Sequence, residues 1–210
     1  MKDIIKYNST RGKDTCLSFE EVLLSGLASD GGLYMPETFP KFSHKELIDM
    51  KNLNYMSLAE KIISPFVGSQ LGKKIGEISR RVYEKFNHTE TAPLIKLDEN
   101  LYIMELFHGP TFAFKDYAMQ FLSELFDEVL KNSNRKSVIL GATSGDTGSA
   151  ALDAFKGKAN LDTFMLFPHN RVSSVQRKQM TSINQKGCFP ISVKTDFDGC
   201  QNLVKKLFKD

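Results

Sequence analysis

The chain has 210 residues, of which 41% are hydrophobic and 16 are phenylalanine, enough to fill a sizeable core in one or two domains. Its net charge of +3 comes from interspersed charges of both signs, which indicates neither a nucleic-acid-binding protein nor a membrane-surface protein. The first residues lack the apolar core of a signal peptide, and no apolar run approaches the length that spans a membrane.

Cysteine and histidine give no indication of a metal site. The three cysteines, Cys16, Cys188 and Cys200, are odd in number, and neither they nor the four scattered histidines have the spacing of metal ligands. Free cysteines are typical of a reducing compartment, so we expect a cytoplasmic protein that binds no metal.

The first 92 residues are predicted to form a mostly helical domain. Three Ser-x-x-Glu capping boxes, Ser18 with Glu21, Ser43 with Glu46 and Ser57 with Glu60, each precede residues with helical apolar spacing. A further helix is expected over 73–86, where apolar residues recur on one face. The pattern loosens near residue 92, and we place the domain boundary there.

From residue 93 to 210 the pattern alternates between short apolar runs and helical periods. The runs are continuous rather than alternating, which is typical of buried parallel strands covered by helices. We therefore predict an α/β fold, in which a helical N-terminal domain precedes a partial three-layer α/β/α domain with a parallel sheet. The expected strands are 101–107, 137–142, 163–167 and 189–193, and the expected helices are 116–131, 147–156, 173–185 and 200–208.

One lysine lies in an aromatic-rich turn at the expected start of a helix. Lys115 follows Phe112 and Phe114 and precedes Tyr117, within the run His-Gly-Pro-Thr-Phe-Ala-Phe-Lys-Asp. If these rings shield the amine from water, the neutral form is favoured, and a neutral amine can attack an aldehyde to form a Schiff base. The alternative is a surface lysine that packs only its aliphatic stem.

A second segment, Gly-Ala-Thr-Ser-Gly-Asp-Thr-Gly over 141–148, follows an apolar strand and precedes a helix. In this arrangement backbone N–H groups and hydroxyls can converge on an anion at the positive end of the helix. The segment lacks the Gly-Lys-Ser/Thr of a P-loop and the glycine spacing of a dinucleotide site. A plain strand-to-helix turn with an Asp or Thr cap is the alternative.

Both segments follow predicted strands of the parallel sheet. Ligands of open parallel sheets collect at the carboxyl ends of the strands. If the strands 101–107 and 137–142 are near neighbours, Lys115 and the 143–148 segment face one crevice. The sequence therefore predicts an active site there.

Taken together, the lysine run and the Ala-Thr-Ser-Gly-Asp-Thr-Gly run resemble threonine synthase, a family of pyridoxal-phosphate (PLP) enzymes of the tryptophan-synthase-β fold type, fold type II. Segments 7–12, 26–36 and 196–204 are similar to the same family, so the resemblance spans essentially the whole chain. The family's chains run on for about as long again, which marks the match as an N-terminal half.

The resemblance implies conversion of O-phospho-L-homoserine and water to L-threonine and phosphate, a step of threonine biosynthesis. Lys115 would carry the PLP as a Schiff base and then act as base and acid on the substrate. Asp146 would lie next to a ring oxygen of the cofactor. The residues implied to hold the substrate carboxylate are Thr143, Ser144, Gly145 and Thr147.

The family's glycine-rich loop for the cofactor phosphate does not occur before Asp210. We therefore expect a C-terminal half in the full-length protein, and little cofactor binding or turnover by the 210-residue chain alone. The other interpretation is a truncated or degenerate relative that performs no chemistry and acts as a binding module.

Overall fold

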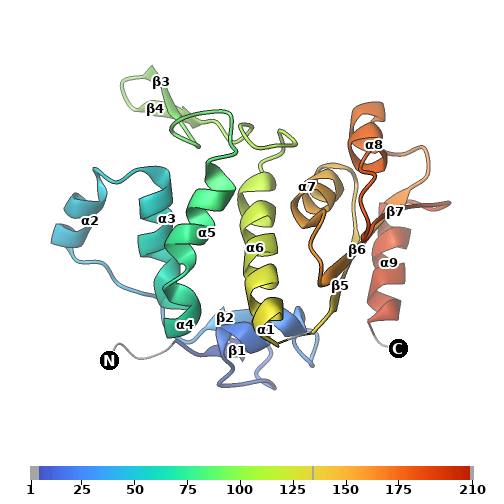
Figure 1. The fold of residues 1–210 in the computed structure, drawn as a ribbon, viewed down its shortest axis with the longest axis horizontal. Coiled ribbons are helices and arrows are strands. Elements are labelled where there is room, and N and C mark those ends of the chain that lie inside the picture. Colours follow the sequence, from blue (N-terminus) through green and yellow to red (C-terminus); the bar gives the residue numbers. More distant parts are fainter. Residues whose placement is uncertain (1–4, 134, 209–210) are drawn as a thin grey trace. The chain divides into compact units, whose positions relative to one another are not determined.

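The computed structural model describes residues 5–133 and 135–208, and Figure 1 shows their course. Contacts divide the chain into two compact units, Met1–Glu84 and Lys85–Asp210. Along the chain, this division falls just before the 91–94 segment, in which the sequence pattern loosens. A domain boundary at residue 92 stays a prediction.

The first unit is mostly helical and also contains a small antiparallel pair of strands. In this pair Tyr7 lies opposite Pro36, and Ser9 lies opposite Tyr34. The strands are too short, at three residues each, to show a period in the sequence. The elements are β1 (Tyr7–Ser9), α1 (Phe19–Ser25), β2 (Tyr34–Pro36), α2 (His44–Met50), α3 (Tyr55–Ile63), η1 (Ser64–Phe66), α4 (Gly68–Gly72) and α5 (Ile75–Tyr83).

Two of the three predicted capping boxes are confirmed. The side chains of Ser18 and Ser43 accept hydrogen bonds from the N3 amides of α1 and α2, and the N3 glutamates bond back to the caps. The third prediction is wrong, because Ser57 lies inside α3. Asn54 caps this helix instead, and its Oδ1 accepts a hydrogen bond from the Ser57 amide at 2.9 Å. Asparagine caps helices as well as serine does, so α3 begins earlier than expected.

The core of this unit lies between α3 and α5. Ile75 and Ile78 are fully buried on one face of α5, in agreement with the predicted apolar face. The ring of Tyr83 lies edge-on to the ring of Tyr55 on α3, with their centroids 4.8 Å apart.

The second unit begins with a hairpin and continues as alternating strands and helices. Its elements are β3 (Leu94–Asp98), β4 (Leu101–Met104), α6 (Asp116–Ser133), β5 (Ser137–Ala142), α7 (Asp146–Phe155), β6 (Leu161–Pro168), α8 (Ser174–Thr181), β7 (Cys188–Val193) and α9 (Phe197–Leu207). The predicted helices and all four predicted strands are present, with ends that differ by a few residues, but only three of the strands belong to the parallel sheet.

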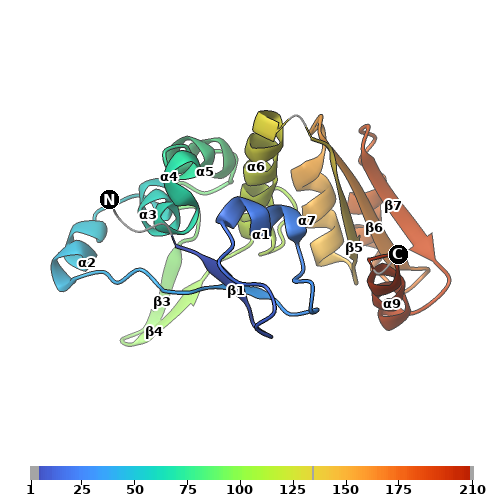
Figure 2. The same ribbon diagram turned by 90° about the horizontal axis from the view of Figure 1, so that it is seen from below.

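Strands β5, β6 and β7 form a parallel sheet in that order. Figure 2 shows α7 on one face of the sheet and α9 on the other, with α6 beside α7. The expected three-layer α/β/α arrangement, part of a fold type II domain, is therefore confirmed. Phe155 and Leu152 of α7 and Met165 of β6 are among the buried residues of this core.

The prediction that the strand over 101–107 belongs to the parallel sheet is wrong. Residues 101–104 form β4, which pairs antiparallel with β3 and not with β5. Only Glu99 and Asn100 separate the two strands, and so short a connection joins antiparallel neighbours, whereas a parallel partner requires a long crossover. Lys96 and Asp98 interrupt the apolar run of β3, which hid this strand in the sequence.

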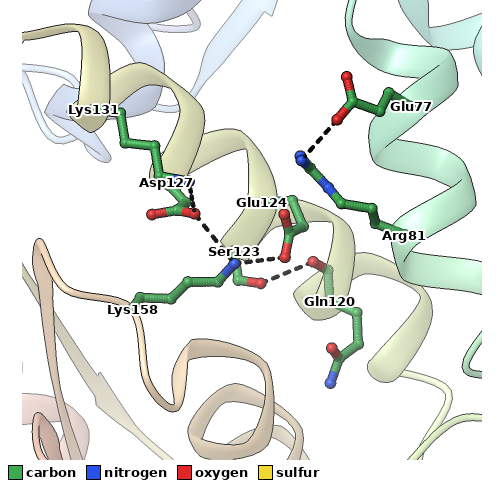
Figure 3. Close-up of polar contacts among 8 residues, drawn as sticks. All are labelled: Glu77, Arg81, Gln120, Ser123, Glu124, Asp127, Lys131 and Lys158. Carbon is green, nitrogen blue, oxygen red and sulfur yellow. Dashed lines mark hydrogen bonds and ion pairs between the residues drawn. The ribbon is translucent and has the colours of Figure 1, made fainter.

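Lys158, which follows α7, forms ion pairs with two residues of α6. Its Nζ lies 2.5 Å from Glu124 Oε1 and 3.5 Å from Asp127 Oδ2, and Lys131 lies 2.8 Å from the same Asp127 oxygen (Figure 3). Only 12–15% of each side chain in the buried pairs of Lys158 with Glu124 and Asp127 is exposed. Partial burial strengthens these ion pairs relative to surface pairs.

Candidate functional site

The lysine loop, residues 109–115, is held by a buried carboxylate. Asp116 begins α6 and is fully buried, and its two oxygens accept hydrogen bonds from the amide and from Oγ1 of Thr111, each at 2.7 Å. Gly109 lies so close to Asp116 that a Cβ atom there would overlap the carboxylate side chain. Burial raises the pKa of Asp116, while the Thr111 hydrogen bonds act in the opposite direction.

Lys115 is the last residue before α6, and its carbonyl accepts a hydrogen bond from the Met119 amide at 2.8 Å. The backbone of the lysine is therefore fixed by the first turn of the helix. Its side chain is half-buried, and Nζ lies 4.7 Å from the centroid of the Phe114 ring. Within residues 5–133 and 135–208, no carboxylate forms an ion pair with this amine.

The aromatic residues around Lys115 are more open than the sequence suggested. Phe112 is 65% exposed and Phe114 is 56% exposed, so within this chain they leave part of the amine's surroundings open to water. Phe112 has a φ of 64°, an uncommon conformation for a residue other than glycine. The hydroxyl of Tyr117 donates to the Thr91 carbonyl, which fixes α6 to the segment before β3.

The hydroxyl loop, residues 143–148, joins β5 to α7 and is shaped from within by Thr143. This side chain is buried, and its Oγ1 accepts hydrogen bonds from the amides of Gly145 at 2.9 Å and Gly148 at 2.8 Å. Gly145 has a φ of 144°, a conformation open mainly to glycine. Ser144 is exposed and Thr147 is half-buried, so these hydroxyls are the ones placed to reach a ligand.

Helix α8 contacts both loops. Gln176 Nε2 donates to Asp146 Oδ1 in the hydroxyl loop at 2.5 Å, and Gln179 Nε2 donates to the Thr111 carbonyl in the lysine loop at 3.1 Å. Helices α6 and α7 are also joined directly, because Gln120 Nε2 donates to Asp153 Oδ2 at 2.7 Å. The two predicted segments therefore lie at one end of the unit, where Figure 1 shows α8 beside α7.

The sequence predicts a helix over 173–185 but indicates no role for its glutamines. The signal for Gln176 was present as a Ser-x-x-Gln capping box with Ser173, which sets Gln176 at the third helical position. Gln179 had no such signal, since its partner is a backbone carbonyl 68 residues away.

The described part of the chain contains no cluster of three or more His, Cys, Asp or Glu side chains arranged to hold a metal ion. None of its helices is long and apolar enough to cross a membrane.

Comparison with known proteins shows which family the chain resembles. Residues 6–83 match the family described as threonine synthase N terminus. Threonine synthase of Pseudomonas aeruginosa is 48% identical over 98% of the chain. The crystal structure of a PLP-bound threonine synthase from Brucella melitensis superposes with a TM-score of 0.91 at 44% identity and also covers 98% of the chain. This chain matches the amino-terminal half of threonine synthases.

The likeness to threonine synthases extends over nearly the whole chain. The yeast threonine synthase structure superposes with a TM-score of 0.90 at 38% identity, over 99% of the chain. The chain spans less than half of each relative, with 44% of the Pseudomonas protein and 45% of the Brucella chain covered. A Xenopus laevis protein named threonine synthase-like 2 is 38% identical over 98% of the chain. Overall identity therefore does not separate these two named groups.

Proposed function

We propose that this chain forms the PLP-attachment and carboxylate-binding part of a threonine synthase, which converts O-phospho-L-homoserine and water to L-threonine and phosphate. The observation that carries the proposal is the joint placement of Lys115 and the hydroxyl loop. One helix, α8, contacts both loops, and both precede helices of the same layer.

The residues present fit PLP. The backbone of Lys115 is held by the first turn of α6. Its amine lies near one aromatic ring and has no carboxylate partner within the described ranges, so it is available to bind an aldehyde. When bound, PLP supplies an electron sink for the substrate's carbons. Asp146, at the start of α7, is the proposed neighbour of the cofactor ring. Contacts to the cofactor phosphate are not assigned to this chain.

The hydroxyl loop would hold the substrate's α-carboxylate. Ser144 and Thr147 present hydroxyl donors, Thr143 holds the loop in shape, and Gly145 lets the backbone approach the ligand. The N-terminus of α7, a helix of ten residues, adds a favourable electrostatic field for an anion. With the carboxylate fixed in this way, the Nζ of Lys115 would move protons at the α and β carbons of the substrate.

In balance, the β carbon loses a proton and gains the hydroxyl of water, while the γ carbon loses phosphate and gains a proton. The proposed setting is the cytoplasm, and the rest of the protein is expected to complete the site. That the 210-residue chain alone binds cofactor poorly stays a prediction.

A non-catalytic relative remains the competing hypothesis, and the intact Lys115 and hydroxyl loop argue against it.

The proposal is tested by assaying the protein expressed from its complete reading frame. With PLP and O-phospho-L-homoserine, the wild type should release phosphate and form threonine in equal amounts. Lys115→Ala should abolish both products, while Lys136→Ala, at an exposed lysine, should leave the rate unchanged. A wild type without turnover, or a Lys115→Ala protein with normal turnover, would contradict the proposal.

A further inference from the structure

We infer that Gln176 and Gln179 of α8 are positioning residues that fix the hydroxyl loop relative to the lysine loop. This inference rests on the proposed function, because it assigns the two glutamines to the same site. Neither glutamine belongs to the two sequence runs that suggested the site.

The carboxamide of Gln176 is held in a single orientation. Its Oε1 accepts hydrogen bonds from the amide and from Oγ of Ser173, at 3.3 Å and 2.8 Å, so its Nε2 is the atom that points to Asp146. The same carboxamide occupies the space beside Gly145, where a Cβ atom would overlap it. Gln176 therefore determines both the partner of Asp146 and the room available at Gly145.

Capping alone does not explain a glutamine at position 176. A capping box accepts glutamate or glutamine at its third helical position, and the boxes of α1 and α2 use Glu21 and Glu46. At position 176 a glutamate would set its carboxylate against Asp146, which costs free energy through like-charge repulsion. The donor amide of glutamine is what the hydroxyl loop requires.

Gln179 lies three residues further along the same face of α8. Its donor reaches the carbonyl of Thr111, whose amide and hydroxyl are bonded to Asp116, the residue after Lys115. Met180, the next residue, is fully buried, and its Sδ atom would lie 2.7 Å from a Cβ atom at Gly148. Helix α8 thus contacts each loop through one glutamine side chain.

A substrate whose α carbon must reach Lys115 while its carboxylate is held at the hydroxyl loop must fit the spacing between the two loops. Because both loops are fixed to α8, this spacing depends on Gln176 and Gln179. Loss of either contact should loosen one loop while the other keeps its position. It should therefore weaken substrate binding more than it lowers the turnover rate of the bound substrate.

The test uses the protein from its complete reading frame, without and with PLP. Gln176→Glu keeps the cap but removes the donor to Asp146, Gln176→Ala removes both, and Gln179→Met removes the donor to Thr111 at similar length. Val175→Ala, at an exposed position of α8, is the matched control. Hydrogen exchange of the amides of Gly145 and Gly148 is measured in the cofactor-free protein, and KM and kcat are measured with O-phospho-L-homoserine.

We expect Gln176→Glu to accelerate exchange in the hydroxyl loop by about tenfold or more, the scale of a lost hydrogen bond to a charged group. KM should rise by about the same factor with a smaller change in kcat, and Gln179→Met should raise KM without accelerating exchange at Gly145. Adding Asp146→Asn to Gln176→Glu restores a donor facing an acceptor and should return the exchange rate towards the wild-type value.

Wild-type exchange and an unchanged KM in Gln176→Glu would overturn the inference. A fall in the melting temperature of Gln176→Glu without any change in loop exchange or KM would also overturn it, because such a result would mean that Gln176 only stabilises its helix. A wild-type protein that neither binds PLP nor turns over would contradict the proposed function instead, and the exchange comparison would still decide the role of Gln176.

Discussion

At the scale of single residues, the carboxylate of Asp116 fixes the loop that presents Lys115. It is fully buried, and both of its oxygens accept hydrogen bonds from Thr111. A buried carboxylate is costly unless it is hydrogen-bonded, and the positive end of α6 lowers the cost further. The lysine next to it gains a defined starting point for its side chain.

Asp116→Asn should destabilise the protein by about 1–3 kcal/mol at neutral pH, because one carboxylate oxygen is replaced by an amide donor that faces a donor of Thr111. The difference is measured by urea unfolding of both proteins. Burial raises the pKa of Asp116, so the folded state binds a proton more readily than the unfolded state.

The stabilising contribution of Asp116 should therefore grow as the pH falls from the raised folded pKa towards the unfolded value of 3.8. The gap in unfolding free energy between wild type and Asp116→Asn should widen over this window. A gap that narrows on acidification would show that the hydrogen bonds of Thr111, rather than burial, dominate the pKa. Asp198→Asn, at an exposed aspartate, is the control.

Gly148→Ala separates helix propensity from packing. Propensity alone predicts a gain of about 1 kcal/mol for alanine inside α7. In the structure the new Cβ atom overlaps the methyl group of Thr143 and approaches Met180 Sδ to 2.7 Å. Overpacking of this kind costs about 1–3 kcal/mol, and displacing Thr143 also strains its bonds to two loop amides, so we expect a net loss in thermal unfolding. A variant more stable than the wild type would contradict the tight packing of α7 on α8.

At the scale of elements, Asp127 of α6 connects this helix to the chain beyond α7 (Figure 3). Burial acts to raise the pKa of Asp127, but the hydrogen bonds and charges of Lys131 and Lys158 outweigh it and lower the pKa. A lowered folded pKa contributes stability above the unfolded pKa, and this stability is lost as the pH falls through the folded pKa.

Asp127→Asn should cost about 1–3 kcal/mol at pH 7, since Lys158 is left with one carboxylate partner fewer in a partly buried site. The cost is measured by urea unfolding at several pH values and should fade below the unfolded pKa of 3.8. A cost that is independent of pH would contradict the ion-pair explanation. Asp162→Asn, at an exposed aspartate, serves as the control.

Elements with a long or regular period were predictable from the sequence. The apolar stripe of α6, the continuous strands β5 to β7 and the caps of α1 and α2 all follow from local rules, and the structure contains them. The apolar residues of β4 also predict a strand, but its antiparallel pairing with β3 does not follow from the sequence, because charged residues interrupt the apolar run of β3. Pairing depends on a neighbour that the period of one strand does not reveal.

The candidate site was predictable to a similar extent. Lys115 and the hydroxyl loop stand out by composition at the ends of expected elements. The inward role of Thr143 and the contacts of Gln176 and Gln179 depend on tertiary packing, which brings atoms together that lie up to 68 residues apart. No local pattern encodes a contact of that kind.

At the scale of the whole molecule, all residues proposed for cofactor and substrate belong to the unit Lys85–Asp210. The named family match covers residues 6–83, in the other unit. The family match and the proposed site therefore lie in different units of the chain. The chain spans less than half the length of these relatives.

The most direct test is to locate PLP on the protein from its complete reading frame. The protein is loaded with PLP and reduced with borohydride, and its peptides are then mapped by mass spectrometry. We expect one PLP-derived mass per chain on the peptide that contains Lys115, and none there in Lys115→Ala. Labelling of a different lysine, or no stoichiometric labelling at all, would contradict it.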